Sequence, residues 1–157
     1  MTSDWKLPWN ASCLCGQVKM RVTGPPAIAM ACHCTGCQKL SSGAYSLTMM
    51  LPTAGFEVKG ETQIGGLHRD DSVHHYCPNC LNWLYTTSPN LTAMGFLNFR
   101  PTMLEDASWV VPFVESQTAE KLPGAVTGAK HSFERWPAPQ DYGRLMQEYA
   151  QEGARPR

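Results

Sequence analysis

The chain has 157 residues, of which 43% are apolar and 17% charged, a composition that excludes a disordered chain and suffices for one domain with its own core. Its 13 basic and 13 acidic side chains cancel and neither sign clusters, which argues against a nucleic-acid partner held by bulk charge. No stretch approaches the roughly 18 apolar residues of a membrane span and the N-terminus lacks a signal-peptide pattern, so we expect a cytoplasmic protein without a membrane partner.

The first third of the chain predicts a lead-in followed by two strands. Residues 1–11 are expected to be a mobile lead-in, from which Trp5 and Trp9 can dock on the core. Polar and apolar residues alternate over 17–22, as is typical of a half-buried strand. The apolar run 27–31 indicates a second strand, which leads directly into a group of three cysteines.

The middle of the chain continues with strand-forming segments and turns. Strands are expected at 44–51, 56–59 and 83–87, and shorter strand candidates lie at 92–97 and 109–114. The segment after the three cysteines fits a short helical turn or a loop. Two adjacent glycines near residue 65 favour a hairpin or a loop there.

One helix is expected near the C-terminus. Leu145, Met146 and Tyr149 lie at helical spacing, and Asp141 is the expected cap. The predicted fold is therefore mainly β and a single domain, with a short C-terminal helix. We expect the β domain to span 11–137 and the helix and tail to span 138–157.

Seven cysteines carry the chemistry, in the units C-x-C, C-x-C-x-x-C and C-x-x-C. Packing preference alone does not gather buried cysteines into such units. Seven is an odd number for disulfides, but a four-thiolate site plus a three-thiolate site accounts for all of them. Zinc is the usual metal for thiolate clusters of this kind. A redox pair at Cys77 and Cys80 is the alternative, although no thioredoxin-like βαβ pattern surrounds it.

The simplest division assigns two zinc ions to the seven thiols. The outer two units would form a closed, structural site that joins distant parts of the chain, with the ligands Cys13, Cys15, Cys77 and Cys80. The central unit would hold a second ion with an open fourth position, as catalytic zinc requires. Its ligands would be Cys32, Cys34 and Cys37.

The central unit is expected to converge through strand and turn geometry. Cys32 and Cys34 occupy alternate positions of an extended segment, so their sulfurs share a face. Gly36 would then let the chain turn and bring Cys37 back toward them. By the same alternation His33 points away from the metal. The alternative is that the fourth position is occupied by a histidine or another polar group. The candidate histidines are His33, His74 and His75.

These motifs resemble the glutathione-dependent formaldehyde-activating enzyme family, which includes centromere protein V-type domains. The matching text lies at 12–16, 32–39 and 76–80, within a resemblance that covers roughly 11–115. The resemblance implies a zinc-binding β-tent fold with antiparallel sheets pinned by zinc. It also implies the same division of ligands, with the central three cysteines on the functional, catalytic ion.

The resemblance further implies a carbon–sulfur lyase whose partners are glutathione and formaldehyde, acting on an adduct such as S-hydroxymethylglutathione. Glutathione carries two carboxylates, for which Lys39 is the first candidate anchor, with Arg69 and Arg100 as others. Two alternatives stay open: a non-enzymatic zinc module that binds a protein partner, and a lyase for another small thiol.

The chain departs from the family pattern at three positions. Leu81 follows the last cysteine where glycine is usual, His74 stands where an arginine is common, and Ser42 lies near a typical glycine. If the backbone at residue 81 needs a positive φ, leucine costs about 1 kcal/mol there.

Overall fold

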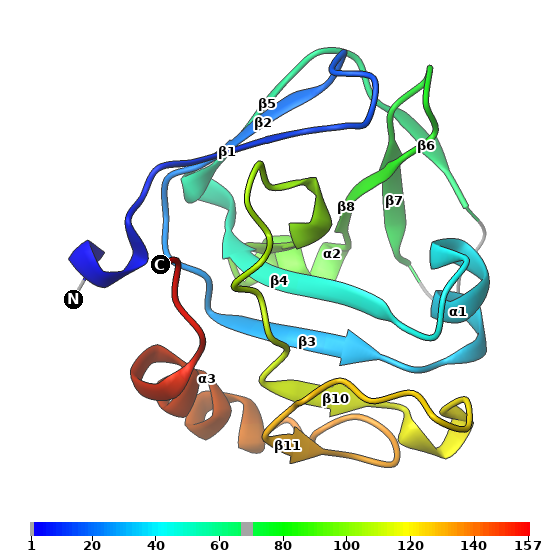
Figure 1. Ribbon diagram of the computed structural model, residues 1–157, viewed down its shortest axis with the longest axis vertical. Coiled ribbons are helices and arrows are strands. Elements are labelled where there is room, and N and C mark those ends of the chain that lie inside the picture. The colour runs from blue at the N-terminus through cyan, green and yellow to red at the C-terminus, as the bar shows by residue number, and fades with distance from the viewer. Residues whose placement is uncertain (1, 67–70) are drawn as a thin grey trace.

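The computed structural model describes residues 2–66 and 71–157, and it contains two β-sheets (Figure 1). The smaller sheet has the order β1-β2-β5, formed by Trp9–Ser12, Lys19–Val22 and Phe56–Lys59. The larger sheet has the order β11-β10-β3-β4-β9-β8-β7-β6. In chain order its strands are β3 (Ile28–Cys32), β4 (Ser46–Pro52), β6 (Gln63–Gly65), β7 (Val73–Tyr76), β8 (Trp83–Thr87), β9 (Phe96–Phe99), β10 (Val114–Ser116) and β11 (His131–Ser132).

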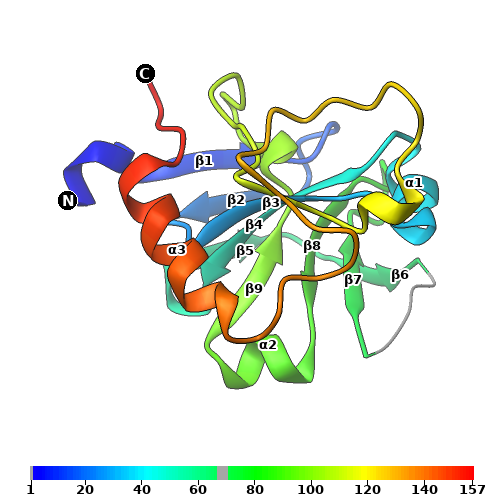
Figure 2. The same ribbon diagram turned by 90° about the horizontal axis from the view of Figure 1, so that it is seen from below.

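Short helices connect and cover these strands. They are α1 (Thr35–Ser41), α2 (Pro89–Ala93) and α3 (Asp141–Glu152), together with four 3-10 turns, η1 (Thr2–Trp5), η2 (Thr53–Gly55), η3 (Pro101–Met103) and η4 (Thr118–Glu120). Helix α3 packs against β3 and buries Leu145 and Tyr149 (Figure 2). In the part of the chain that the structure describes, no helix is both long and apolar enough to cross a membrane.

The prediction of a mainly β fold with a short C-terminal helix is confirmed. Strands β2, β3, β4, β5 and β8 lie where the patterns of alternation and strand-forming residues placed them. Their inward side chains, among them Val22, Ile28, Leu51 and Leu84, are fully buried in the shared core. The periodicity was informative for β2, β3, β4 and β8 because each of these strands buries at least one face, whereas β5 has only Phe56 partly buried.

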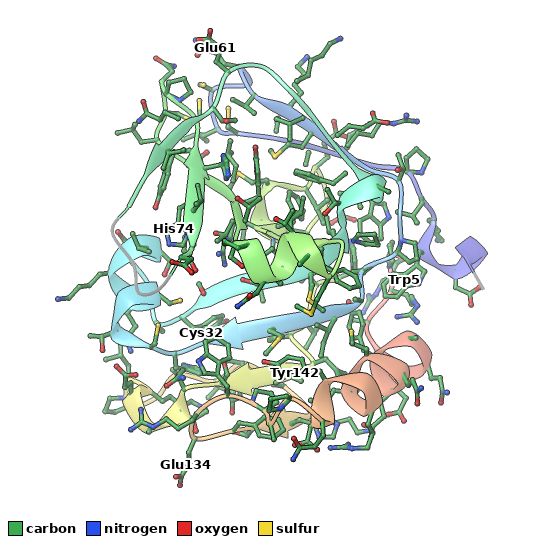
Figure 3. All side chains as sticks on the ribbon, turned by 180° about the vertical axis from the view of Figure 1, so that it is seen from behind. Trp5, Cys32, Glu61, His74, Glu134 and Tyr142 are labelled. Atoms are coloured by element: carbon green, nitrogen blue, oxygen red, sulfur yellow. The ribbon has the colours of Figure 1, made fainter. Side chains whose placement is uncertain are left out.

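The N-terminal lead-in is more ordered than expected. Trp9 begins β1, which pairs antiparallel with β2 and completes the small sheet. The rings of Trp5 and Trp9 are buried, and the Trp9 ring centroid lies 5.0 Å from that of Trp109. Indole rings carry large apolar area, so burying them holds this segment on the core. Figure 3 shows Trp5 at the edge beside α3, away from Cys32 and His74.

Three element predictions were wrong in detail. The segment 92–97 is divided between α2 and β9, because Ser88 accepts a hydrogen bond from the Leu91 N–H and starts a helix. The segment 109–114 is not strand until Val114. Asp141 is the first residue of α3 and not its cap, a position held by Gln140.

Candidate metal centres and the adjoining pocket

The first cluster joins the two sheets. Cys13 follows the last residue of β1 in the small sheet, and Cys77 follows the last residue of β7 in the large sheet. The turns after these strands add Cys15 and Cys80. All four sulfurs lie within 4.8 Å of one another, although the two pairs are more than 60 residues apart in the chain.

The spacing of these sulfurs fits a tetrahedral thiolate site. The Cys13 and Cys15 sulfurs are 3.5 Å apart, and the Cys15 and Cys77 sulfurs are 3.7 Å apart. Sulfurs at 2.3 Å from a central zinc ion would be about 3.8 Å apart in an ideal tetrahedron. The Val18 N–H donates to the Cys13 sulfur, as backbone amides do around metal-bound thiolates. The residues present therefore fit a four-thiolate metal site.

The backbone directly after Cys80 has the conformation that glycine would favour. Leu81 has φ 58°, and its N–H donates to the Cys77 carbonyl at 3.0 Å. Ser42, another of the three departures from the family pattern, has φ 51° at the C-cap of α1. Both positions are in the left-handed region, so both departures place a side chain where it is strained.

Replacing Leu81 with glycine is expected to stabilise the protein by about 1 kcal/mol, because the left-handed conformation costs glycine nothing. The Leu81 side chain is 60% exposed, so little buried area is lost. Thermal unfolding of the metal-loaded protein measures the effect as a rise in Tm. The matched control is Leu14→Gly, at an 88% exposed leucine beside the same cluster without a positive φ, which should lower Tm. A lower Tm for L81G would contradict the strain argument.

The second cluster is local and buried. Cys32 is the last residue of β3, Cys34 is the N-cap of α1, and Cys37 lies in the first turn of that helix. Their sulfurs lie within 4.8 Å of one another. The convergence was predicted, but the means differ: the strand ends at Cys32, and Gly36 is helical with no positive φ. The helix start brings the three thiols together, and the Cys37 N–H donates to the Cys34 sulfur at 3.3 Å.

Cys37 is the thiol of this cluster that ionises most readily. A hydrogen bond from the Cys32 thiol has the largest influence on the pKa of Cys37. Hydrogen bonds from Ser46 and Cys34 and the charge of Arg100 act in the same direction. Together they lower the pKa of Cys37 to about 5, against the opposing effect of burial. Ser46 pairs with Cys32 across β3 and β4, which explains its position. Three converging thiols, one already acidic, are a donor set that suits a zinc ion.

Arg100 places a buried cation next to this cluster. Its side chain is 7% exposed, its guanidinium lies 3.5 Å from the centre of the Trp83 ring, and Nη2 donates to Thr86 at 3.0 Å. Nη1 donates to the Leu47 carbonyl and to Thr48, so these hydrogen-bond partners are neutral, and Nε has no partner among residues 2–66 and 71–157. Burial lowers the pKa of Arg100 to about 10, which leaves it charged at neutral pH.

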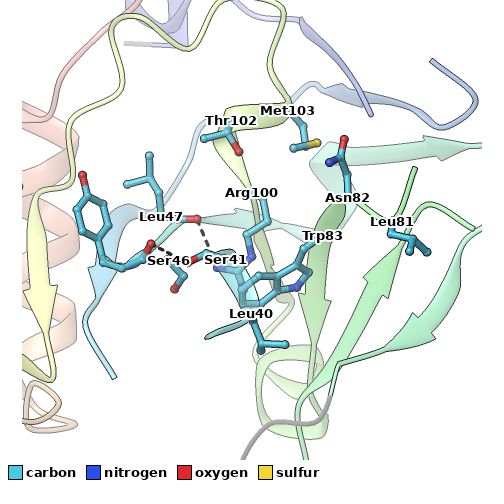
Figure 4. Close-up of a pocket in the computed structure, with 11 residues that line it drawn as sticks. Leu40, Ser41, Ser46, Leu47, Leu81, Asn82, Trp83, Arg100, Thr102 and Met103 are labelled. Carbon is cyan, nitrogen blue, oxygen red and sulfur yellow. Dashed lines mark hydrogen bonds between the residues drawn. The ribbon is translucent and has the colours of Figure 1, made fainter. Parts of the chain in front are cut away.

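A pocket of about 440 Å³ opens over Arg100 and Trp83 (Figure 4). Ser46 on β4, which pairs with Cys32 at the end of β3, belongs to its lining, so the pocket adjoins the second cluster. The full lining comprises Leu40, Ser41, Tyr45, Ser46, Leu47, Leu81, Asn82, Trp83, Arg100, Thr102 and Met103. It combines aromatic and aliphatic walls with one buried positive charge, as expected for binding a small anionic ligand.

The histidines have other partners in the part of the chain described. His33 is fully buried, and its Nε2 lies 2.9 Å from a Glu115 carboxylate oxygen. His74 and His75 hydrogen-bond to Thr86 and Thr87 on β8. Among the described residues neither cluster includes a histidine.

The candidate anchors differ in their positions. Arg100 lines the pocket, whereas Lys39 is exposed on α1 and is not among the lining residues. Arg69 lies outside the described residues. Sequence reasoning missed Trp83 and Ser46, since neither belongs to a motif and both reach the pocket through strand pairing.

Known proteins share parts of this architecture. The sequence model of a family described as glutathione-dependent formaldehyde-activating enzyme matches residues 8–117, a range that contains both cysteine clusters. A crystal structure of a Rhodobacter sphaeroides protein is similar in fold, with a TM-score of 0.51 and 15% sequence identity. The similarity covers 63% of this chain and 90% of that one. A comparison with curated proteins gives no match.

Proposed function

Because this chain belongs to the glutathione-dependent formaldehyde-activating enzyme family, we propose that it is a zinc-dependent carbon–sulfur lyase acting on thiol–aldehyde adducts such as S-hydroxymethylglutathione. The three-cysteine cluster carries the proposal. It offers three of the four positions of a tetrahedral zinc ion, and among the described residues no fourth histidine, cysteine or carboxylate joins it. A site that leaves one position for an exchangeable ligand is what catalytic zinc requires.

The donor set favours a thiol as that ligand. Zinc bound by three thiolates would be a weaker Lewis acid than zinc bound by three neutral histidines, and would accept a substrate thiol as its anion. In the reaction, the thiol sulfur adds to the aldehyde carbon, and the proton released by the thiol ends on the new hydroxyl oxygen. The reverse reaction breaks that C–S bond. The chain contributes three buried thiols and the neighbouring positive charge of Arg100.

Arg100 is the proposed anchor for a carboxylate of glutathione. A buried guanidinium with neutral hydrogen-bond partners, whose Nε has no partner in the described part of the chain, favours an anion in the pocket that it lines. The Trp83 ring, whose centre lies 3.5 Å from the guanidinium, contacts Arg100 within the same pocket lining. We propose Lys39 for the second carboxylate, because α1 carries it one residue from Leu40 of the pocket lining.

Glutathione is expected to raise the Tm of the zinc-loaded protein, with a smaller rise for glutathione diethyl ester, because esterification removes the charges that Arg100 would bind. In the Arg100→Lys variant the difference between acid and ester should shrink, since lysine lacks the planar fork of donors. Thermal-shift titrations measure these effects. The control is Arg144→Lys on α3, an exposed arginine paired with Glu148. Equal shifts for acid and ester in the original protein would contradict the anchor.

Turnover separates an enzyme from a binding module. NMR exchange spectroscopy on a mixture of formaldehyde and glutathione measures the rate at which S-hydroxymethylglutathione forms and breaks down. The zinc-loaded protein is expected to accelerate this exchange above the uncatalysed rate. Two bound zinc ions without any acceleration would favour the non-enzymatic module, and acceleration with cysteine or cysteamine alone would favour a lyase for another thiol.

A further inference from the structure

One segment of the chain lies beside the three-cysteine cluster and is hydrogen-bonded to it. We call residues 115–134, which run from β10 through η4 to β11, the strap (Figure 2, yellow to orange). Strand β10 pairs in parallel with β3, so Ser116 lies beside Cys32. The His33 N–H then donates to the Ser116 carbonyl at 3.0 Å. The strap therefore contacts the chain where the ligands begin.

Glu115, a buried residue of the strap, links the strap to His33 between the first two cysteines. Its carboxylate lies 2.9 Å from His33 Nε2 and accepts hydrogen bonds from Thr127 at 2.8 Å and Ser132 at 2.9 Å. Lys121 adds an ion pair at 3.2 Å. The side chain is almost wholly buried, and these donors lower the pKa of Glu115 to about 2 despite the opposing effect of burial. A buried carboxylate with this many donors has one well-defined position.

Glu120 fixes the strap to the start of α1. Its carboxylate accepts hydrogen bonds from the Thr35 N–H, at 3.2 Å, and from the Thr35 hydroxyl. The Gln38 side chain donates both to the Glu120 carbonyl at 2.9 Å and to the His33 carbonyl at 2.7 Å. Gln38 thus ties η4 to the residue between the first two ligands.

The residues held in this way alternate with the ligands. His33 separates Cys32 from Cys34, Thr35 follows Cys34, and Gln38 follows Cys37. Each of these three residues is hydrogen-bonded to the strap. Among the described residues, the strap itself contributes no member to the cluster. The four-cysteine cluster is supported elsewhere: Asn82 accepts from the Leu14 N–H at 2.7 Å, and Val18 contacts Cys13. The strap therefore supports the segment that carries the three-cysteine cluster.

We infer that Glu115 and Glu120 are positioning residues, which hold the backbone between the three cysteines so that their sulfurs converge on one metal ion. This inference rests on the proposed function, because it presumes that this cluster binds zinc. Glu120 and most partners of Glu115 lie beyond the residues 8–117 matched by the family model, so family membership does not by itself supply them. Supporting residues of this kind tune metal affinity by orienting the ligands.

The test compares the metal affinity of the two clusters in one protein. In Glu115→Gln, an amide N–H₂ faces groups that donated hydrogen bonds to the carboxylate. The zinc dissociation constant of the three-cysteine site should therefore rise about 10–100-fold. The four-cysteine site should be unchanged. Competition with a chromophoric zinc chelator gives both constants, and the absorption of the cobalt-loaded protein reports the geometry of each site. The matched control is Glu148→Gln, which removes the carboxylate of the His131 pair at 2.7 Å.

A second variant guards against misfolding of the first. Glu120→Ala changes a half-buried side chain and should weaken the three-cysteine site in the same selective way. The inference is overturned if both variants bind two zinc ions as the control does, or if both sites weaken together, as a purely structural role would require. An original protein that binds a single zinc ion would instead remove the second metal site on which the proposed function rests.

Discussion

Replacing Cys34 with serine is expected to lower the zinc content from two ions to one per chain and to abolish catalysed exchange of formaldehyde. Serine cannot supply a thiolate, and the two sulfurs that remain would be too few to hold an ion in a site with an open position. The substitution is nearly isosteric and does not affect the four-cysteine cluster that connects the two sheets. The Tm of the variant should therefore change little. Elemental analysis and exchange NMR on the purified variant measure both effects.

The control for this variant is Cys80→Ser, which changes a ligand of the other cluster. Cys80→Ser should lower Tm more strongly than it lowers the rate of catalysed formaldehyde exchange. This is the reverse of the result expected for Cys34→Ser. Full retention of the second zinc ion, or of activity, in Cys34→Ser would end the assignment of the central cysteines as ligands of the functional metal.

Replacing Cys77 with serine is expected to unfold most of the protein at 37 °C. The Cys77 sulfur is fully buried at the point where β7 of the large sheet meets the turn after β1 of the small sheet. The apparent binding free energy of a structural zinc ion, about 10–16 kcal/mol, is as large as the roughly 5–15 kcal/mol that stabilises a typical domain. Losing one ligand removes much of that contribution.

Circular dichroism against temperature, with and without a strong chelator, measures this effect. The chelator should lower the Tm of the original protein toward that of Cys77→Ser and have little further effect on the variant. Unchanged Tm in Cys77→Ser, together with loss of one zinc ion, would show that the four-cysteine cluster does not hold the sheets together. Comparing this variant with Cys34→Ser separates a structural from a functional role for the two sites.

The spacing of the cysteines was enough to predict both clusters, because ligands within a few residues of one another are constrained by local geometry. Cys32, Cys34 and Cys37 can converge only through a strand end, a turn or a helix start, and all three alternatives bring the sulfurs together. The grouping of Cys13 and Cys15 with Cys77 and Cys80 needed one further premise, that four thiolates close a tetrahedral site. The structure brings the sulfurs together as that premise required.

The surroundings of the clusters were beyond sequence reasoning. The pocket joins Arg100, which follows β9, with Trp83 of β8 and Ser46 of β4, and no motif links these residues. The strap reaches the cluster through pairing of β10 with β3, over 80 residues apart in the chain. The glutamates that hold it, Glu115 and Glu120, look like ordinary surface residues in the sequence.

By itself, therefore, the sequence determined the grouping of the thiols and the mainly β character of the chain, because thiol spacing and side-chain alternation act over a few residues. Only the tertiary structure decided what lies around the sulfurs: the buried charge of Arg100, the pocket beside it, and the carboxylates of Glu115 and Glu120 that hydrogen-bond to the residues next to these cysteines. Those arrangements depend on which strands pair, and strand pairing is set by burial over the whole chain and not by local pattern.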